Sequence, residues 1–144
     1  MKLEDIFDMW KLDTNIDHTE LSAEALRIPQ LHHKYFQIYS HERLVLRKYE
    51  TELKKLKLEK YEFFTQGPTQ ETVAKGWNLP PIGKVIKSEV NNYIDADNDV
   101  IALTLKVGIQ QEKVDFLDSV IRSLNNRGFL IKNAIDFEKF KVGM

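Results

Sequence analysis

The sequence predicts a mainly α-helical protein, on three observations. Charged residues make up 30% of its 144 residues and hydrophobic residues 42%, a balance typical of a folded helical protein and too apolar for a disordered one. No glycine or proline interrupts residues 30–64, where apolar residues recur at spacings of three, four or seven. The chain is also long enough to bury a core by itself, so we expect one domain.

The first elements expected are two helices before residue 30. An amphipathic helix over residues 3–12 carries its apolar side chains on one side and acids near its N-terminal end, where the helix dipole favours negative charge. A second helix starts near Glu20 with Thr19 as its N-cap. Pro29 lies inside this pattern and lacks a backbone N–H, which predicts a kink or a break there.

Beyond Pro29 a long helix is expected over residues 30–64. At 1.5 Å per residue, about 35 residues would span roughly 50 Å, more than a small globular domain needs. The apolar stripe is therefore expected to be buried against other helices or other subunits. Glu42 and Lys60 occupy the remaining positions of this seam. Its apolar members are Tyr35, Tyr39, Leu46, Tyr49, Leu53, Leu56 and Phe63.

Residues 65–84 predict a loop, since they hold three of the six glycines and three of the four prolines. Trp77 in this loop has two interpretations. It stacks on a nucleobase, or it packs into the groove where the loop returns to the helices, and packing is favoured.

A second long helix is expected over residues 100–128, with Asp97 and Asn98 as caps and Gly128 as its C-terminal stop. Its apolar stripe is broader than one partner helix would cover. The β-branched alternation of residues 100–109 leaves a strand there as the alternative. Residues 129–144 add a further amphipathic segment.

Composition and motifs exclude several classes of function. The chain has no cysteine, which excludes disulfides and favours a reducing compartment. It lacks phosphate-binding loops, nucleophile elbows and zinc-protease motifs, so we expect no enzyme and no cofactor. A metal site from His33, His41 and a carboxylate is a minor alternative to ordinary surface histidines. No apolar run is long enough for a membrane span, and the acidic N-terminus does not resemble a signal peptide.

The basic run over residues 42–62 has two interpretations. It holds seven lysines and arginines against five glutamates, a net of +2, while the whole chain has a net charge of −1. Interleaved Lys and Glu are typical of the solvated side of a coiled coil. Cations followed closely by Tyr61, Phe63 and Phe64 are instead typical of a single-strand binder, in which the rings stack on bases.

Several segments together point to a known family: "MKLEDI", "IDHTELSAEAL", the long basic helix ending in "YEFF", and residues 87–144. The most specific positions are "ADNDV" and Arg127, Gly128, Phe129, Ile131, Lys132, Asp136, Phe137 and Phe140. In these segments the chain resembles the UvsY family of T-even-like bacteriophages. The resemblance implies a non-enzymatic protein that binds single-stranded DNA and assembles into a ring of six or seven subunits. It implies loading of the phage recombinase onto strands covered by the phage single-strand-binding protein, in the cytoplasm of the infected bacterial host.

The resemblance also implies a division of labour along the chain. Residues 1–65 form a helical DNA-binding arm, residues 66–86 a connection, and residues 87–144 the assembly part. A helical scaffold without nucleic-acid binding is the alternative. The expected subunit interface comprises Leu103, Val107, Val114, Leu117, Ile121 and Leu124.

The family's basic motif places two cations, separated by one residue, just before a pair of aromatics. By position the aromatics are Phe63 and Phe64 and the nearer cation is Lys60. The farther cation falls on Leu58, for which the adjacent Lys57 substitutes. The expected DNA-binding residues are Lys54, Lys55, Lys57, Lys60, Arg47, Lys48, Phe63, Phe64 and Lys84.

Overall fold

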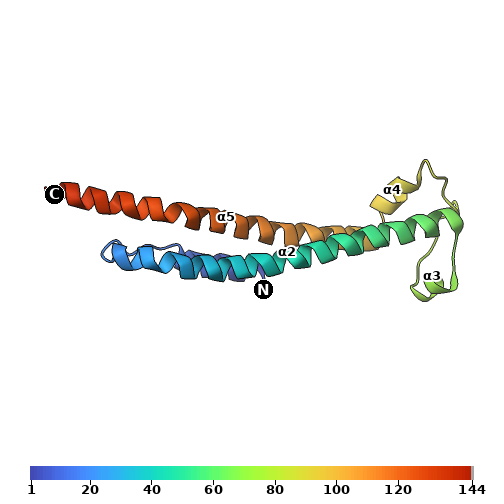
Figure 1. Ribbon diagram of the computed structural model, residues 1–144. Helices are drawn as coiled ribbons and strands as arrows, with labels where there is room; N and C mark the ends of the chain where they lie inside the picture. The colour runs from blue at the N-terminus through green and yellow to red at the C-terminus, as the bar shows by residue number, and fades with distance from the viewer. Residues whose placement is uncertain (144) are drawn as a thin grey trace. The chain divides into compact units, whose positions relative to one another are not determined.

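The computed structural model describes residues 1–143, which form helices and loops and no strand (Figure 1). The mainly α prediction is confirmed, and the strand considered for residues 100–109 is wrong because these residues are helical. The helices are α1 (Leu3–Asp13), α2 (Leu21–Gln66), α3 (Gln70–Ala74), α4 (Val90–Asp95) and α5 (Asn98–Lys141).

The chain divides into two compact units. Unit 1 combines Met1–Leu44 with the chain from Gln110 onward, and unit 2 is Val45–Ile109. This division differs from the expected one into residues 1–65, 66–86 and 87–144, because α2 and α5 each contribute to both units.

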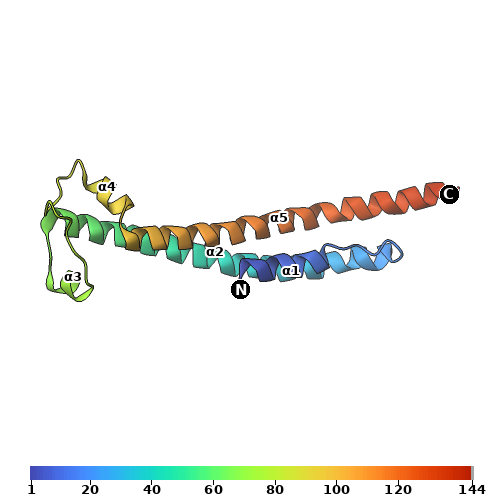
Figure 2. The same cartoon turned by 180° about the vertical axis from the view of Figure 1, so that it is seen from behind.

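Unit 1 is a packing of three helices, with α1 lying alongside α2 (Figure 2). The ring of Trp10 meets the fully buried Tyr35 edge-on, with centroids 5.3 Å apart. Phe7 meets Phe116 in the same way at 4.6 Å. Edge-to-face pairs of this kind add to the stability that burial of the rings provides. The buried core comprises Ile6, Leu31, Tyr35, Leu117, Val120 and Leu124.

Polar contacts fix the C-terminal end of α1 within unit 1. The Asp13 carboxylate accepts hydrogen bonds from Lys34 Nζ at 2.6 Å and from the Tyr35 hydroxyl at 2.8 Å. Burial raises the pKa of Asp13, but these hydrogen bonds and the nearby cations outweigh burial and leave that pKa below its ordinary value. The Arg127 guanidinium donates to the Asp13 carbonyl and to the Glu24 carboxylate. These bonds hold α1 to both long helices.

Unit 2 encloses a second core between the C-terminal part of α2, α4 and the start of α5. Asp97 caps α5 as predicted, since its Oδ2 accepts from the backbone N–H groups of Asp99 and Val100. The buried side chains are Phe63, Phe64, Val85, Val90, Ile94 and Val100.

Helix α2 departs from the prediction near its start. It begins at Leu21, and the Thr19 hydroxyl donates to Asp17 and so does not act as the predicted N-cap. The helix also runs through Pro29 without a break, because proline removes only one backbone donor from a helix held on either side by packing.

Helix α5 does not stop at Gly128, as predicted, but continues to Lys141. Arg127 and Ile131 are buried on either side of this glycine, at 3% and 2% exposure. Their burial favours the helical path more than the single glycine opposes it.

The loop predicted for residues 65–84 contains the short helix α3, which the prediction missed. Thr69 begins it with a reciprocal pair of hydrogen bonds to Thr72. The usual capping box has Glu or Gln at this third position. Thr72 stands there instead, so the sequence only weakly indicated the start of a helix.

Candidate nucleic-acid interface

Lys60 is a buried structural residue. Its side chain, 4% exposed, pairs with Asp97 and Asp99, each at 3.1 Å. Its Nζ also lies 3.7 Å from the ring centre of Trp77. A phosphate could reach this ammonium only by displacing two carboxylates, so we leave Lys60 out of the candidate DNA surface.

Phe63 and Phe64 are core residues, 2% and 6% exposed. Neither ring presents a face on which a base could stack, so both also leave the candidate surface. Trp77 packs edge-on against Phe63, with centroids 5.6 Å apart. Of the two interpretations of Trp77, the structure shows the packed one.

The exposed cations of α2 in unit 2 lie on two flanks of the helix. Arg47, Lys54 and Lys57 are separated by seven and three residues, which places them on one side. All three are exposed, and among residues 1–143 no carboxylate forms an ion pair with them. Glu50 is the acid on this side. We call Arg47, Lys54 and Lys57 the cationic flank.

Lys48 and Lys55 lie on the opposite flank, again seven residues apart. Each is followed four residues later by a glutamate, Glu52 and Glu59 respectively, and Glu62 lies one further turn along. The carboxylates therefore offset the positive charge of this flank, so the helix presents two sides of different electrostatic character.

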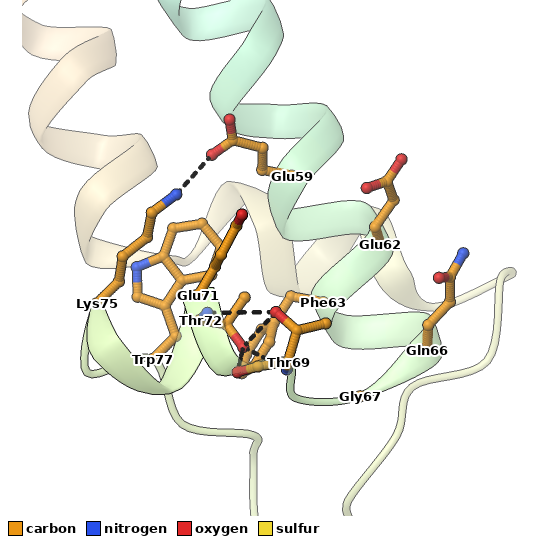
Figure 3. Close-up of a pocket in the computed structure, with 10 residues that line it drawn as sticks. All are labelled: Glu59, Glu62, Phe63, Gln66, Gly67, Thr69, Glu71, Thr72, Lys75 and Trp77. Atoms are coloured by element: carbon orange, nitrogen blue, oxygen red, sulfur yellow. Dashed lines mark hydrogen bonds and ion pairs between the residues drawn. The ribbon is translucent and has the colours of Figure 1, made fainter.

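A hollow at the end of α2 has the wrong charge for phosphate. Figure 3 shows Glu59, Glu62 and Glu71 around it, with Trp77 in its wall. The lining cation is Lys75, and it is paired with Glu59 at 3.3 Å. This hollow would repel a nucleic-acid backbone.

A second hollow of about 280 Å³ adjoins the cationic flank. Lys57 lines it from α2, Asp95 from the end of α4, and the rest comes from the first two turns of α5. We call it the Lys57 hollow. Its walls are Lys57, Asp95, Val100, Ile101, Thr104 and Leu105.

Sequence reasoning did not find the Lys57 hollow. The available signal was the spacing of Ile101, Leu105 and Ile109, four residues apart and away from the buried seam. All three are exposed, at 42%, 64% and 59%. Recognising a hollow also required the position of α4, which periodicity does not give.

Lys84, the last of the expected DNA-binding residues, lies in the loop that follows α3. Its side chain lies against the buried Gly67, where an added Cβ would meet Lys84 Cε at 3.0 Å. It is exposed and lies beyond the end of α2, apart from the cationic flank.

Three of the six expected interface residues of α5 are buried within their own chain, and the other three are half-buried. Val114, Leu117 and Leu124 are buried, at 7%, 0% and 1% exposure, and Leu103, Val107 and Ile121 are half-buried. A second subunit has little of the three buried side chains to contact. An interface through the three half-buried side chains stays a prediction.

A different apolar face is open in unit 1. Phe129, Leu130, Phe137 and Phe140 are 69%, 60%, 59% and 78% exposed. At about 100° per residue they lie within roughly 100° of one another around α5. We call these four residues the aromatic face.

The described residues offer neither a metal site nor a membrane-spanning helix. Residues 1–143 hold no group of three histidine or carboxylate side chains placed to share a metal ion. Among the described helices, none combines the length and the apolar character that a bilayer span requires.

Comparison with known proteins identifies the family. The profile of the family described as "Recombination, repair and ssDNA binding protein UvsY" matches residues 9–144. The chain belongs to the UvsY family. The resemblance expected from the sequence is confirmed. Bacteriophage T4 recombination protein UvsY is 25% identical over 144 residues, which cover 99% of each chain.

Crystal structures of the T4 recombination mediator protein UvsY share the fold. One crystal form superimposes with a TM-score of 0.85 at 24% identity, covering 99% of each chain. Another gives 0.81 at 22% identity, covering 95% of this chain and 98% of the T4 chain. At these identities the likeness establishes the fold, and the family profile establishes the class of recombination, repair and single-stranded-DNA-binding proteins.

Proposed function

We propose that this UvsY-family protein binds single-stranded DNA through the cationic flank and acts as a recombination mediator. In this role it is not an enzyme. It helps the phage recombinase to load onto strands covered by the phage single-strand-binding protein, in the cytoplasm of the infected host. The observation that carries the DNA-binding part is the balance of charge on the two flanks: Arg47, Lys54 and Lys57 are exposed beside one acid, Glu50, whereas Lys48 and Lys55 share their flank with Glu52, Glu59 and Glu62.

The spacing of these cations suits a strand lying along the helix. The ten residues from Arg47 to Lys57 span roughly 15 Å at 1.5 Å per residue. Over such a length a nucleic-acid strand presents several phosphates. Each phosphate held by a lysine or arginine releases condensed counterions, which favours binding at low salt.

We further propose that the protein acts as a ring of six or seven subunits. Three cations on one subunit give weak binding, but linked copies bind one strand together and so raise the overall affinity. The aromatic face supports this proposal, because an apolar patch of this kind marks a contact surface. We therefore propose the aromatic face as the subunit contact, in place of the apolar seam of α5 that was expected from the sequence.

Fluorescence anisotropy of a labelled single-stranded oligonucleotide, at several salt concentrations, tests the proposal. Lys54→Glu with Lys57→Glu should weaken binding strongly and lower the salt slope by about 0.7 for each phosphate that the protein no longer neutralises. The matched control is Lys48→Glu with Lys55→Glu, which changes the formal charge equally on the opposite flank. We expect the control pair to bind more tightly than the first pair.

Two outcomes would overturn different parts of the proposal. If the wild-type oligomer does not bind at low salt, the helical scaffold without nucleic-acid binding becomes the better description. If wild-type protein binds but both variant pairs weaken it equally, DNA binding stands and the assignment to the cationic flank is wrong.

A further inference from the structure

We infer that the Lys57 hollow holds one nucleobase of the bound strand. This inference rests on the proposed function and deepens it, because it adds a base-binding subsite to a phosphate-binding helix. The hollow and the cationic flank share Lys57.

The walls suit the flat, apolar faces of a base. Ile101 and Leu105 are the accessible apolar part of the wall, at 42% and 64% exposure, whereas Val100 beneath them is buried in the core. Both exposed apolar side chains come from α5, so they offer packing to one face of a base. At about 280 Å³ the hollow lies just below the usual range of small-molecule pockets, which suits a single base.

Two polar groups at the walls could read the edge of that base. Neither the Asp95 carboxylate nor the Thr104 hydroxyl has a hydrogen-bond partner elsewhere in the described chain, residues 1–143. A carboxylate only accepts hydrogen bonds, so Asp95 favours a base with an amino group, as when Asp or Glu accepts from the cytosine N4 amine. A cytosine strand should therefore bind more tightly than a thymine strand.

Charge complementarity favours a nucleic acid over a protein as the occupant. A strand with phosphates on Lys54 and Lys57 carries its bases only one sugar away from those phosphates, within reach of the hollow. A protein side chain entering the hollow would need an acidic neighbourhood to match the same lysines.

The test compares two strands of equal length and phosphate number, one of cytosines and one of abasic sugars. Leu105→Ala should weaken binding of the cytosine strand several-fold, because it removes the larger part of the exposed apolar surface on which the base packs. It should leave binding of the abasic strand unchanged. Ile109→Ala is the matched control, because Ile109 is also exposed on α5 but does not line the hollow. Asp95→Asn should reduce the preference for cytosine over thymine.

Each outcome separates the inference from the proposed function. If the wild type binds neither strand, both fail together. If it binds both strands equally, or if Leu105→Ala and Ile109→Ala weaken the cytosine strand alike, only the inference fails. Leu105→Ala could also weaken the binding of both strands equally and change the mass of the protein oligomer. In that case the hollow is a contact between protein subunits, and the inference is again wrong.

Discussion

Lys60 and Glu42 show how a charged residue can belong to a helical seam. The carboxylate of Glu42, 3% exposed, accepts a hydrogen bond of 2.6 Å from Gln110 in unit 1. Lys60 instead pairs with Asp97 and Asp99 in unit 2. A buried charge is tolerated only when it is paired and hydrogen-bonded, and the cation nearest Glu42 is the N-terminal ammonium of Met1, 3.9 Å from its Oε1. In both cases the partner comes from a distant part of the sequence, 68 residues away for Gln110 and 39 for Asp99.

Replacing Lys60 by methionine keeps most of the side-chain volume and removes the charge. We expect Lys60→Met to lower the free energy of unfolding by about 1–3 kcal/mol, because Asp97 loses its cation while largely buried. Urea denaturation measures this loss. DNA affinity of the folded fraction should stay unchanged, whereas Lys54→Met should weaken DNA binding without loss of stability. If Lys60→Met is as stable as the wild type but binds DNA more weakly, Lys60 contacts DNA and its assignment as a structural residue is wrong.

At the scale of an element, glycine has different structural roles at the end of α2 and inside α5. Gly67 follows the last residue of α2 with φ +96°, in the left-handed region that favours glycine. Gly128 lies inside α5, where an added Cβ would meet only Ile28 Cδ1, at 4.0 Å. The first glycine ends its helix by conformation, and the second is simply a weak helix former.

These two glycines should respond oppositely to alanine. Gly128→Ala should raise the free energy of unfolding by about 0.5–1 kcal/mol, because alanine loses less backbone entropy on folding. Gly67→Ala should lower it by about 1–3 kcal/mol from backbone strain at its positive φ, because the nearby Lys84 side chain is exposed and can move aside. Urea titrations of both variants check the signs. A destabilised Gly128→Ala would contradict the description of Gly128 as only a weak helix former.

At the scale of the whole molecule, the apolar residues of α5 have two separate roles. One set, including Leu117 and Leu124, is fully buried within the chain. The aromatic face lies on the other side of the helix and is largely exposed. Three phenylalanines and a leucine leave more apolar surface in water than scattered surface residues do.

Charge placed on the aromatic face should dissociate the assembly. Phe137→Glu with Phe140→Glu should lower the mass measured by light scattering and lower the apparent DNA affinity, although the cationic flank is unchanged. The helix should stay folded, because both side chains are exposed. Asn125→Glu with Lys132→Gln changes the net charge equally on exposed positions of α5 outside this face and should leave the mass unchanged. An unaltered mass in the phenylalanine variant would exclude the face as the subunit contact.

Much of the fold was predictable because it depends on local chemistry. Residues 3–12 were placed correctly as a helix, the Asp97 cap is confirmed, and Glu42 and Lys60 were recognised as seam positions from the helical period alone. The errors at Thr19 and Gly128 have different causes. At Gly128 the local preference is about 1 kcal/mol and packing decides the result, whereas the exposed Thr19 bonds to Asp17 and so does not cap the helix.

The sequence by itself therefore determined the helical class, the two long helices and the UvsY family, because periodicity and family motifs persist along the chain. Only the tertiary structure decided which residues each helix buries and which it exposes. The structure shows that Lys60, Phe63 and Phe64 are buried in unit 2, whereas Arg47, Lys54 and Lys57 are exposed. The physical reason is that charge and aromaticity are properties of a residue, whereas access to a ligand depends on the partners that distant segments bring to it.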